Sequence, residues 1–291
     1  MATEREDEDL EDIFDSSLFT LFSIPPIGFA PNSKNGYYTY KPPLIHDNIN
    51  FEPVKLKIPE PPSKFYNTLQ AQLIWPSSIY LADLIFKEII KVKDKTVIEL
   101  GSAAGLPGII SYLKDAQKVI STDYPIDEVL NVLKDNFQRA EFSKTKGAEE
   151  GHGKKCEWEV LGHCWGQDTS ELIRSISFQS DEPPDTPQSK FDVVLAADVL
   201  WTTSSHSILL DSISALLSKS GVVHITAGLH TGRGPVERLL NSARERGFQV
   251  DYKGEVRLRG DGGWDMYDES LAVKGEEERG VVVWFTLQFM E

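Results

Sequence analysis

Hydrophobic side chains in the middle of the chain recur at helical spacing, and short runs of β-branched residues separate these segments. After Pro76 the apolar residues return every three or four positions, which predicts a helix over residues 77–91. The same pattern predicts further helices over residues 106–113, 127–139, 170–177, 206–218 and 235–246. The β-branched runs predict strands over residues 96–100, 119–122, 157–161, 191–197 and 222–227. Strands that alternate with helices indicate an α/β fold, in which helices cover both faces of a mainly parallel sheet.

The end of the chain does not follow this alternation. Two more strands are predicted over residues 248–252 and 281–289. Residues 253–280 between them are rich in Gly, Asp and Glu and predict no helix. We therefore expect the last strand to enter antiparallel, as the hairpin partner of the strand before it.

The first part of the chain differs in composition from the rest. Residues 1–15 carry many acidic side chains against the single Arg5, and such a self-repelling run predicts a disordered tail that keeps the protein soluble, or less often an arm that docks a basic partner. Residues 16–62 are rich in Pro, Asn, Ser and Tyr and predict an extended lead-in. Short alternating runs at 37–40 and 54–58 predict one or two edge strands within it.

The remaining residues, 63–291, are expected to form one domain. Polar stretches that contain Gly or Pro, at residues 143–155 and 179–190, predict surface loops inserted into it. The sequence contains no internal repeat of fixed period.

The charge of the chain limits its partners. The sequence of 291 residues is 40% hydrophobic, which is enough to bury a sizeable core. It has 45 acidic and 30 basic residues, which gives a formal net charge of −15. Such a chain repels nucleic-acid phosphates and anionic lipid headgroups, so we expect neither nucleic acid nor membrane as a partner. Basic peptides and small neutral cofactors fit better.

The cysteines and the N-terminus favour the cytoplasm. Cys156 and Cys164 are the two cysteines, too few for a disulfide framework or for a structural zinc site without distant histidines. The N-terminus is acidic where a secretory or mitochondrial leader would be basic, and no apolar run reaches about 18 residues. We therefore expect a cytoplasmic protein.

The histidines predict no metal site. His152 and His163 lie close in sequence to the two cysteines, but their spacing matches no zinc pattern, so we expect no metal. His230 follows a predicted strand at its carboxyl edge, where it can face a cleft. His224, within the same strand, is expected to be a partnered residue of the sheet.

The most informative segment is the glycine turn that follows the strand at 96–100. In open α/β sheets ligands bind at the carboxyl ends of the strands, which places a cofactor over Gly101. A dinucleotide fingerprint needs glycines at the third and sixth positions of this turn, where the chain has Ala103 and Leu106. Glu99 two residues before Gly101, with Gly105 four residues after it, instead resembles motif I of class I S-adenosylmethionine-dependent methyltransferases.

A second carboxylate supports a nucleoside-containing cofactor. Asp123 closes the next strand about 20 residues after the glycine turn, where a carboxylate can accept both ribose hydroxyls of an adenosine. NAD and S-adenosylmethionine would both use it. The alternative is that Asp123 caps the following helix.

Five blocks in order make the resemblance more specific. The sequence is similar to lysine methyltransferase family 16, in particular to the fungal branch described as nicotinamide N-methyltransferase-like, which includes the elongation factor 1A N-terminal and lysine methyltransferase. The blocks, which span about residues 72–248, are Gln72 to Pro76, Glu99 to Gly105, Thr122 to Pro125 with Asn131 and Asn136, Cys164 to Gly166, and Ala196 to Trp201.

The resemblance implies a Rossmann-like, seven-stranded, mainly parallel sheet with an antiparallel C-terminal strand, and S-adenosyl-L-methionine as cofactor. It implies that Trp75 lines the cofactor pocket, that Glu99 and Gly101 hold the methionine end, that Asp123 holds the ribose and that Trp165 contacts the adenine. The full set of cofactor-binding residues that it implies is Trp75, Glu99, Gly101, Ala103, Asp123, Tyr124, Trp165 and Ala197. The catalytic residues that it implies are Asp198, at the target-facing end of the fourth strand, and Trp201.

Two positions depart from the family pattern. The middle glycine of motif I is Ala103, which would crowd the cofactor, and the aromatic place of the family's Asp-x-x-Tyr or Asp-x-x-Phe motif holds Trp201.

Three functions remain open from the sequence. The first is an N-methyltransferase that acts on protein amino groups, a lysine or an N-terminal amine, with elongation factor 1A as the candidate substrate. The second is a small-molecule methyltransferase that acts on the aromatic amine nicotinamide. The third is a catalytically silent binding module, favoured only by Ala103 and Trp201. We expect a monomer in each case.

Overall fold

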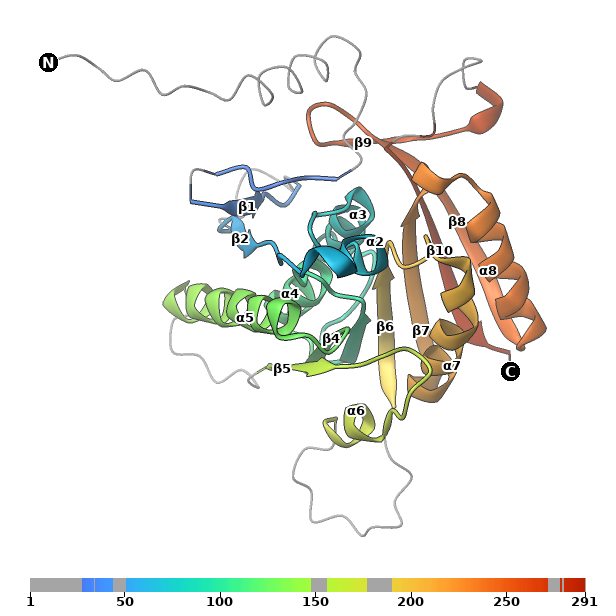
Figure 1. The fold of residues 1–291 in the computed structure, drawn as a ribbon, viewed down its shortest axis with the longest axis horizontal. Helices are drawn as coiled ribbons and strands as arrows, with labels where there is room; N and C mark the ends of the chain where they lie inside the picture. Colours follow the sequence, from blue (N-terminus) through green and yellow to red (C-terminus); the bar gives the residue numbers. More distant parts are fainter. Residues whose placement is uncertain are drawn as a thin grey trace, which may run out of the picture.

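The chain forms a central β-sheet with helices packed around it (Figure 1). The computed structural model describes residues 28–33, 35–43, 51–147, 156–176, 190–271, 278 and 280–290. The predicted acidic tail and most of the two predicted polar loops lie outside the described residues.

The central sheet has the order β5-β4-β3-β6-β7-β10-β8-β9. Its strands are β3 (Thr96–Leu100), β4 (Lys118–Asp123), β5 (Glu157–Gly162), β6 (Phe191–Ala197), β7 (Leu217–Gly228), β8 (Phe248–Leu258), β9 (Trp264–Met266) and β10 (Val281–Phe289). Strands β3 to β7 pair in parallel with one another. The prediction of a mainly parallel seven-stranded sheet is confirmed, with β9 as an additional edge strand that the sequence did not reveal.

The last strand is antiparallel, as predicted. It pairs with β8 over Val281 to Phe289, and it also pairs with β7 on its other side. The chain therefore inserts β10 between two strands that precede it in sequence. The segment predicted to be irregular between residues 253 and 280 is partly strand, because β8 continues to Leu258 and then turns back into β9.

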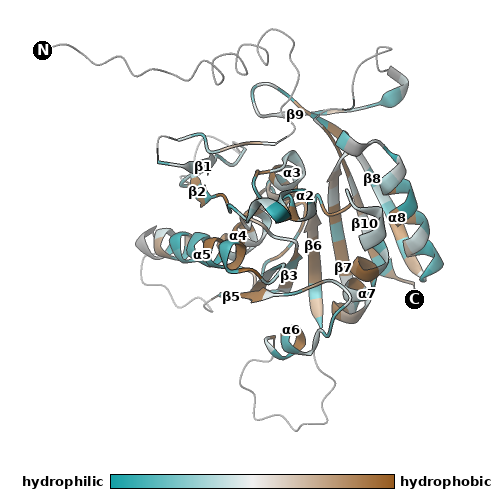
Figure 2. Cartoon of the chain, in the orientation of Figure 1, coloured by the Kyte–Doolittle hydropathy of each residue, from teal (hydrophilic) through white to brown (hydrophobic). Residues whose placement is uncertain are grey.

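Helices cover both faces of the sheet, as predicted. They are α2 (Tyr66–Leu69), α3 (Pro76–Phe86), α4 (Leu106–Leu113), α5 (Asp127–Gly147), α6 (Ser170–Arg174), α7 (His206–Leu216) and α8 (Gly234–Glu245), with short 3-10 turns η1 (Ser63–Phe65), η2 (Thr203–Ser205), η3 (Leu229–Thr231) and η4 (Glu269–Leu271). Apolar residues of α3, α4 and α5 share one core cluster, and those of α6, α7 and α8 share another. Figure 2 shows that α5 and α8 carry both hydrophobic and hydrophilic residues, as expected of helices with one buried side.

Two helix ends differ most from the prediction, while α6 and α7 end two or three residues early. Helix α3 ends at Phe86, because the backbone turns into the left-handed region at Glu88 (φ +58°), so Ile89 is 55% exposed. Helix α5 continues to Gly147, eight residues beyond the predicted end, so residues 143–147 are helical where a loop was expected. Lys144 on this extension donates to the Tyr112 carbonyl oxygen at 2.8 Å, which ties it to α4.

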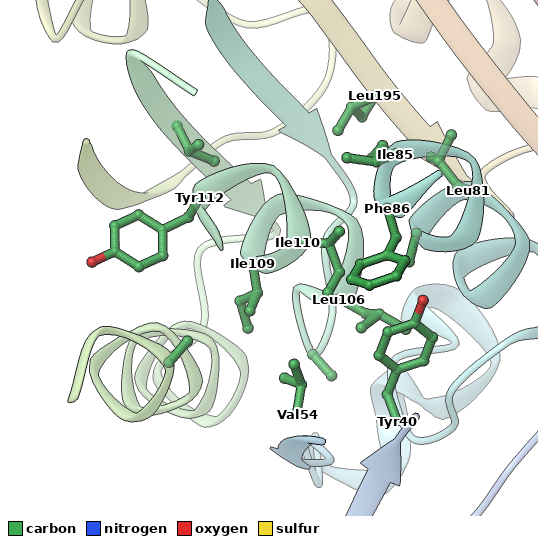
Figure 3. Packing of buried hydrophobic residues seen from close by; sticks show 14 of the residues in the cluster. Tyr40, Val54, Leu81, Ile85, Phe86, Leu106, Ile109, Ile110, Tyr112 and Leu195 are labelled. Atoms are coloured by element: carbon green, nitrogen blue, oxygen red, sulfur yellow. The ribbon is translucent and has the colours of Figure 1, made fainter. Parts of the chain in front are cut away.

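The strands β1 (Tyr37–Tyr40) and β2 (Val54–Lys57) pair only with each other and form a separate antiparallel sheet. The sequence predicted edge strands here, but neither strand belongs to the main sheet. They pack instead on the core, where Figure 3 shows Tyr40 and Val54 directed toward side chains of α3 and α4. The domain boundary at residue 63 stays a prediction. No helix within the described ranges is long and apolar enough to cross a membrane.

Candidate active site

A cavity of about 530 Å³ lies at the carboxyl ends of the parallel strands. All ten predicted site residues line it, namely Trp75, Glu99, Gly101, Ala103, Asp123, Tyr124, Trp165, Ala197, Asp198 and Trp201. The cavity wall also includes residues that the sequence did not single out, among them Phe65, Leu69, Gln70, Thr202, Ser205 and Ile208. These come from the segments before α3 and around η2, whose sequences carry no motif, so only the fold brings them to the site.

The glycine turn after β3 leaves room that a side chain would fill. Gly101 has φ +71°, and a Cβ on it would lie 3.1 Å from Val199 Cγ1 and 3.3 Å from Trp165 Cζ2. Gly105 has φ +82°, and a Cβ there would lie 2.4 Å from Leu133 Cδ1 on α5. The first glycine therefore keeps the cavity open, and the second allows α4 to pack closely against α5.

Ala103 adopts the left-handed conformation that the missing glycine would favour, with φ +46°. Its backbone N–H donates to Asp123 Oδ2 at 2.7 Å. This charge-assisted bond helps to hold a non-glycine residue in a backbone conformation that costs about 1–2 kcal/mol.

Asp123 is buried at the end of β4, and both its oxygens face backbone donors. Oδ2 accepts from Ala103 and Oδ1 accepts from the N–H of Tyr124 at 2.7 Å. It therefore does not cap α5, which begins at Asp127. Burial raises the pKa of Asp123 to about 6, against the opposing effect of the two N–H groups. Each oxygen keeps a free lone pair, so the carboxylate can still accept hydroxyl groups of a ribose.

We expect the pKa of Asp123 to make cofactor binding pH-dependent. Ribose hydroxyls donate to the ionised carboxylate, so protonation of Asp123 opposes binding. Affinity for S-adenosylmethionine, measured by calorimetry, should be constant above about pH 7 and should fall by up to about tenfold per pH unit below the pKa of about 6. In Asp123→Asn the affinity should be weaker and should vary less over the same range. An equal slope in this variant would show that another group causes the pH dependence.

Glu99 lies under the glycine turn and is 1% exposed. Its Oε2 accepts from the N–H of Gly108 at 3.0 Å and from the hydroxyl of Ser121 at 3.2 Å. Burial raises the pKa of Glu99 to about 8, so the carboxyl is mostly protonated at neutral pH. Glu99 therefore joins α4 to β4 as well as lining the cavity, and a cationic amino group bound there would favour its ionised form.

Trp75 marks the start of α3 on the cavity wall. Its Nε1 donates to the Gln70 carbonyl oxygen at 2.8 Å, and its ring stacks on His230 at a centroid distance of 5.0 Å and an interplanar angle of 25°. The indole is therefore held from two sides, which makes it a rigid wall for a ligand.

Asp198 lies just beyond β6, with φ +56°. Its side chain is only 5% exposed, and Oδ1 accepts from the N–H of Gly228 at 3.2 Å. Oδ2 is buried without a hydrogen-bond partner among the described residues, as is the hydroxyl oxygen of Ser77. Burial raises the pKa of Asp198, and His230 and the Gly228 N–H oppose that shift. A carboxyl group in this environment is a stronger proton acceptor than one in water.

His224 in β7 and His230 in η3 differ in their surroundings. His230 contacts Asp198 and Trp75 but does not line the main cavity. His224 lies beside Trp284 with a centroid distance of 6.2 Å, and burial lowers its pKa to about 3. Its Nδ1 has no hydrogen-bond partner in the described part of the chain, so the expectation of a partnered histidine is wrong for this atom.

The loop that carries Trp165 is held by one serine of α7. Ser212 Oγ accepts from the N–H of Gly166 at 2.8 Å and lies 3.0 Å from His163 Nε2. Cys164 in this loop also lines the cavity. No group of three potential ligands that could hold a metal ion occurs among the described residues, and His152 lies outside them.

Asn136 of α5 links the cavity to the N-terminal strands. The residue is completely buried; its Nδ2 donates to Ala104 O at 3.0 Å and to Lys57 O at 2.8 Å, and its Oδ1 accepts from Lys57 N at 2.8 Å. Asn136 belongs to the blocks that the sequence shares with its family, but a sequence pattern does not reveal which backbone groups it contacts.

We expect Asn136→Ala to weaken cofactor binding. The change leaves backbone groups of Lys57 and Ala104 without their partner, and each buried unsatisfied group costs about 1–3 kcal/mol. Affinity for S-adenosylmethionine should fall about tenfold, and the thermal midpoint should fall by several degrees. Ser111→Ala is a matched control, because it removes a buried hydroxyl of α4 that bonds only to Pro107 O at 2.9 Å. Equal losses of affinity in both variants would contradict a specific role of Asn136.

Comparisons with known proteins show the family of this chain. The profile of the lysine methyltransferase family matches residues 61–230, which is more than half of the chain. The chain is 30% identical over 200 residues to a Candida albicans protein named "Protein N-terminal and lysine N-methyltransferase EFM7", covering 67% of this chain and 69% of that protein. It is 28% identical over 197 residues to the Gibberella zeae protein of the same name, covering 65% and 70%. A precorrin-6y C5,15-methyltransferase from Geobacter metallireducens has a TM-score of 0.43 and 10% identity, covering 72% of this chain and 86% of that one.

Fold and cavity together define a Rossmann-like, S-adenosylmethionine-dependent methyltransferase. The chain belongs to the lysine methyltransferase family. The residues present fit the cofactor, because Gly101 leaves space beside Trp165 and Asp123 offers a carboxylate with free lone pairs in the same cavity.

Proposed function

We propose that this protein transfers a methyl group from S-adenosylmethionine to amino groups of a protein, a lysine or an N-terminal amine. The observation that carries the proposal is the wall of the cavity, where Asp198 and the indole of Trp201 line the same space as Trp75 and the other residues proposed to bind the cofactor. A carboxylate and aromatic faces suit a cationic acceptor, which a neutral metabolite would not require.

The cofactor supplies an electrophilic methyl group on a sulfonium, so the residues of the chain need to position and deprotonate the acceptor. A lysine amine has a pKa of about 10 in water and must lose a proton before it can attack. Asp198 orients the amine and accepts this proton, while Trp201 removes water from it and stabilises the methylated cation. Correct placement of the two reactants can lower the activation barrier of such a reaction by roughly 7–11 kcal/mol.

We propose Glu99 and Gly101 for the methionine end, Asp123 for the ribose and Trp165 for the adenine. Ala103, Tyr124 and Ala197 complete this part of the wall. The contacts of Asp123 and the space at Gly101 support these assignments.

Elongation factor 1A is the substrate that we propose to test. Family resemblance suggests it, the fungal relatives are named for N-terminal and lysine methylation, and a net charge of −15 favours a substrate that presents basic residues.

The test offers the same enzyme two acceptors. Purified elongation factor 1A or nicotinamide is incubated with S-adenosylmethionine that carries a radiolabelled methyl group, and mass spectrometry then locates the methyl group on the labelled product. We expect label on the protein at a lysine or at the N-terminal amine. Label on nicotinamide alone would replace the proposal with small-molecule methylation.

A further inference from the structure

His230 touches Asp198 and Trp75, two residues of the main cavity's wall, without lining that cavity itself. Its Nε2 lies 4.0 Å from Asp198 Oδ1, and its ring stacks on Trp75. Its side chain is 19% exposed, against 5% for Asp198. It also lines a second, small cavity of about 10 Å³ together with Gly280 and Val281. The imidazole therefore lies between the buried carboxylate and a more accessible part of the molecule.

Methylation of an amine leaves one proton to be removed. The ammonium R–NH₃⁺ first loses a proton; the lone pair then forms the N–C bond, the S–C bond of the sulfonium breaks, and its electron pair stays on sulfur. The products are R–NH₂–CH₃⁺, the thioether and one H⁺. A carboxyl group that is 5% exposed cannot easily pass this proton to water by itself.

The surroundings of Asp198 offer few acceptors for that proton. Its carboxylate faces the N–H of Gly228, the hydroxyl of Ser77 and the imidazole of His230. The N–H is only a donor, and Ser77 is completely buried. Of these groups only the imidazole can both take up a proton and release it, since it has exposed surface.

Among the described residues, Asp198 is the charged group in contact with the His230 ring. The nearest basic residue in the sequence, Arg233, is directed elsewhere, with Nη1 at 2.5 Å from Glu255 Oε1 and Nε at 2.8 Å from Glu278 Oε1. Within the described residues no cation is in contact with the imidazole, so Asp198 is its charged neighbour.

We propose that His230 is a positioning and proton-transfer residue, which takes the substrate proton from Asp198 and releases it to solvent at its exposed surface. The distance of 4.0 Å is longer than a hydrogen bond, and a small ring rotation or one bridging water closes it. The inference rests on the proposed function, because only an amine that is protonated in water needs this route.

The first test separates the stacking of the ring from its proton chemistry. His230→Phe keeps an aromatic ring against Trp75 but cannot accept a proton, and His230→Gln keeps a polar group that does not titrate. We expect kcat for methyl transfer into elongation factor 1A to fall about 10²-fold in both, with affinity for S-adenosylmethionine changed by less than about twofold. His224→Phe, a change at the other histidine of the same segment, should leave kcat unchanged. Wild-type kcat in His230→Phe would overturn the inference.

The second test uses His230→Ala and two small molecules of the same size. Imidazole titrates near neutral pH, whereas pyrazole has the same shape and does not accept a proton there. Imidazole should raise the kcat of His230→Ala at least about tenfold, and pyrazole should leave it unchanged. Equal rescue by both would show that His230 only fills space, and would overturn its role in proton transfer.

The two proposals fail in different ways. If the wild-type enzyme methylates no protein amine while it binds S-adenosylmethionine, the proposed function fails. If wild type and His230→Phe methylate the same amine at the same rate, the proposed function stands and the inference about His230 fails.

Discussion

Asp198→Asn is expected to lower kcat for a protein amine by roughly 10²- to 10⁴-fold, because a carboxamide cannot accept the substrate proton. The substitution keeps the shape of the side chain, and its Oδ1 can still accept from the Gly228 N–H, which is 3.2 Å from that oxygen. Affinity for S-adenosylmethionine, measured by calorimetry, should barely change. A loss confined to kcat is the pattern of an interaction made mainly in the transition state.

A matched change at the other end of the same strand provides the control. Asp192 Oδ2 accepts from the backbone N–H of Thr96 at 2.9 Å and lies outside the cavity wall. Asp192→Asn can lower stability, but it should leave kcat within about twofold of wild type. If Asp198→Asn instead lost cofactor affinity in proportion to its rate, Asp198 would belong to the cofactor side of the cavity. With nicotinamide as acceptor the loss should be much smaller, because no proton has to leave a pyridine nitrogen.

Gly101→Val is expected to abolish measurable cofactor binding, with a loss of more than about 100-fold in affinity. A side chain here would start 3.1 Å from Val199 Cγ1 and 3.3 Å from Trp165 Cζ2, and the two methyl groups of valine would extend into the cavity. The backbone has φ +71°, where a β-branched residue is strained. Calorimetry with S-adenosylmethionine measures the effect, and circular dichroism shows whether the fold survives.

The control for this change has the same backbone strain without the steric block. Gly262 has φ +83°, and nothing lies within 4 Å of a Cβ placed on it. Gly262→Val should lower the thermal midpoint and leave cofactor affinity intact. A similar loss of affinity in both variants would attribute the effect of Gly101→Val to strain in the fold.

Much of the fold could be predicted because its signals are local. Hydrophobic periodicity in α4 and β-branched runs such as that of β3 depend on residues next to each other in the chain. The turn at Gly101 and the carboxylate of Asp123 could be predicted for a related reason, since strand ends in a parallel sheet meet at one edge. The other predicted site residues follow from the family resemblance, and all ten line one cavity.

Elements whose position depends on distant partners could not be predicted. The sequence indicated that β10 is antiparallel, but not that it inserts between β7 and β8. The three residues of β9 are too few for a periodic signal, and they are held by Trp264, whose Nε1 donates to Asp83 Oδ2 at 2.9 Å. Asp83 also accepts from the hydroxyl of Tyr40 at 2.5 Å, so one buried carboxylate joins segments far apart in the chain.

By itself the sequence determined where the cofactor turn lies, because residue type and spacing along one strand and its turn are enough to place a carboxylate beside a glycine, and the family resemblance added the other predicted site residues. Only the tertiary structure decided what those residues face. Asp198 was predicted at the end of β6, but its burial against Gly228, Ser77 and His230 follows from the packing of β7 and α3 on that end. The contacts of Asn136 with Lys57 and Ala104 arise in the same way. Hydrogen bonds and desolvation depend on distances in space, and residues tens of positions apart in the sequence come within those distances only when the chain has folded.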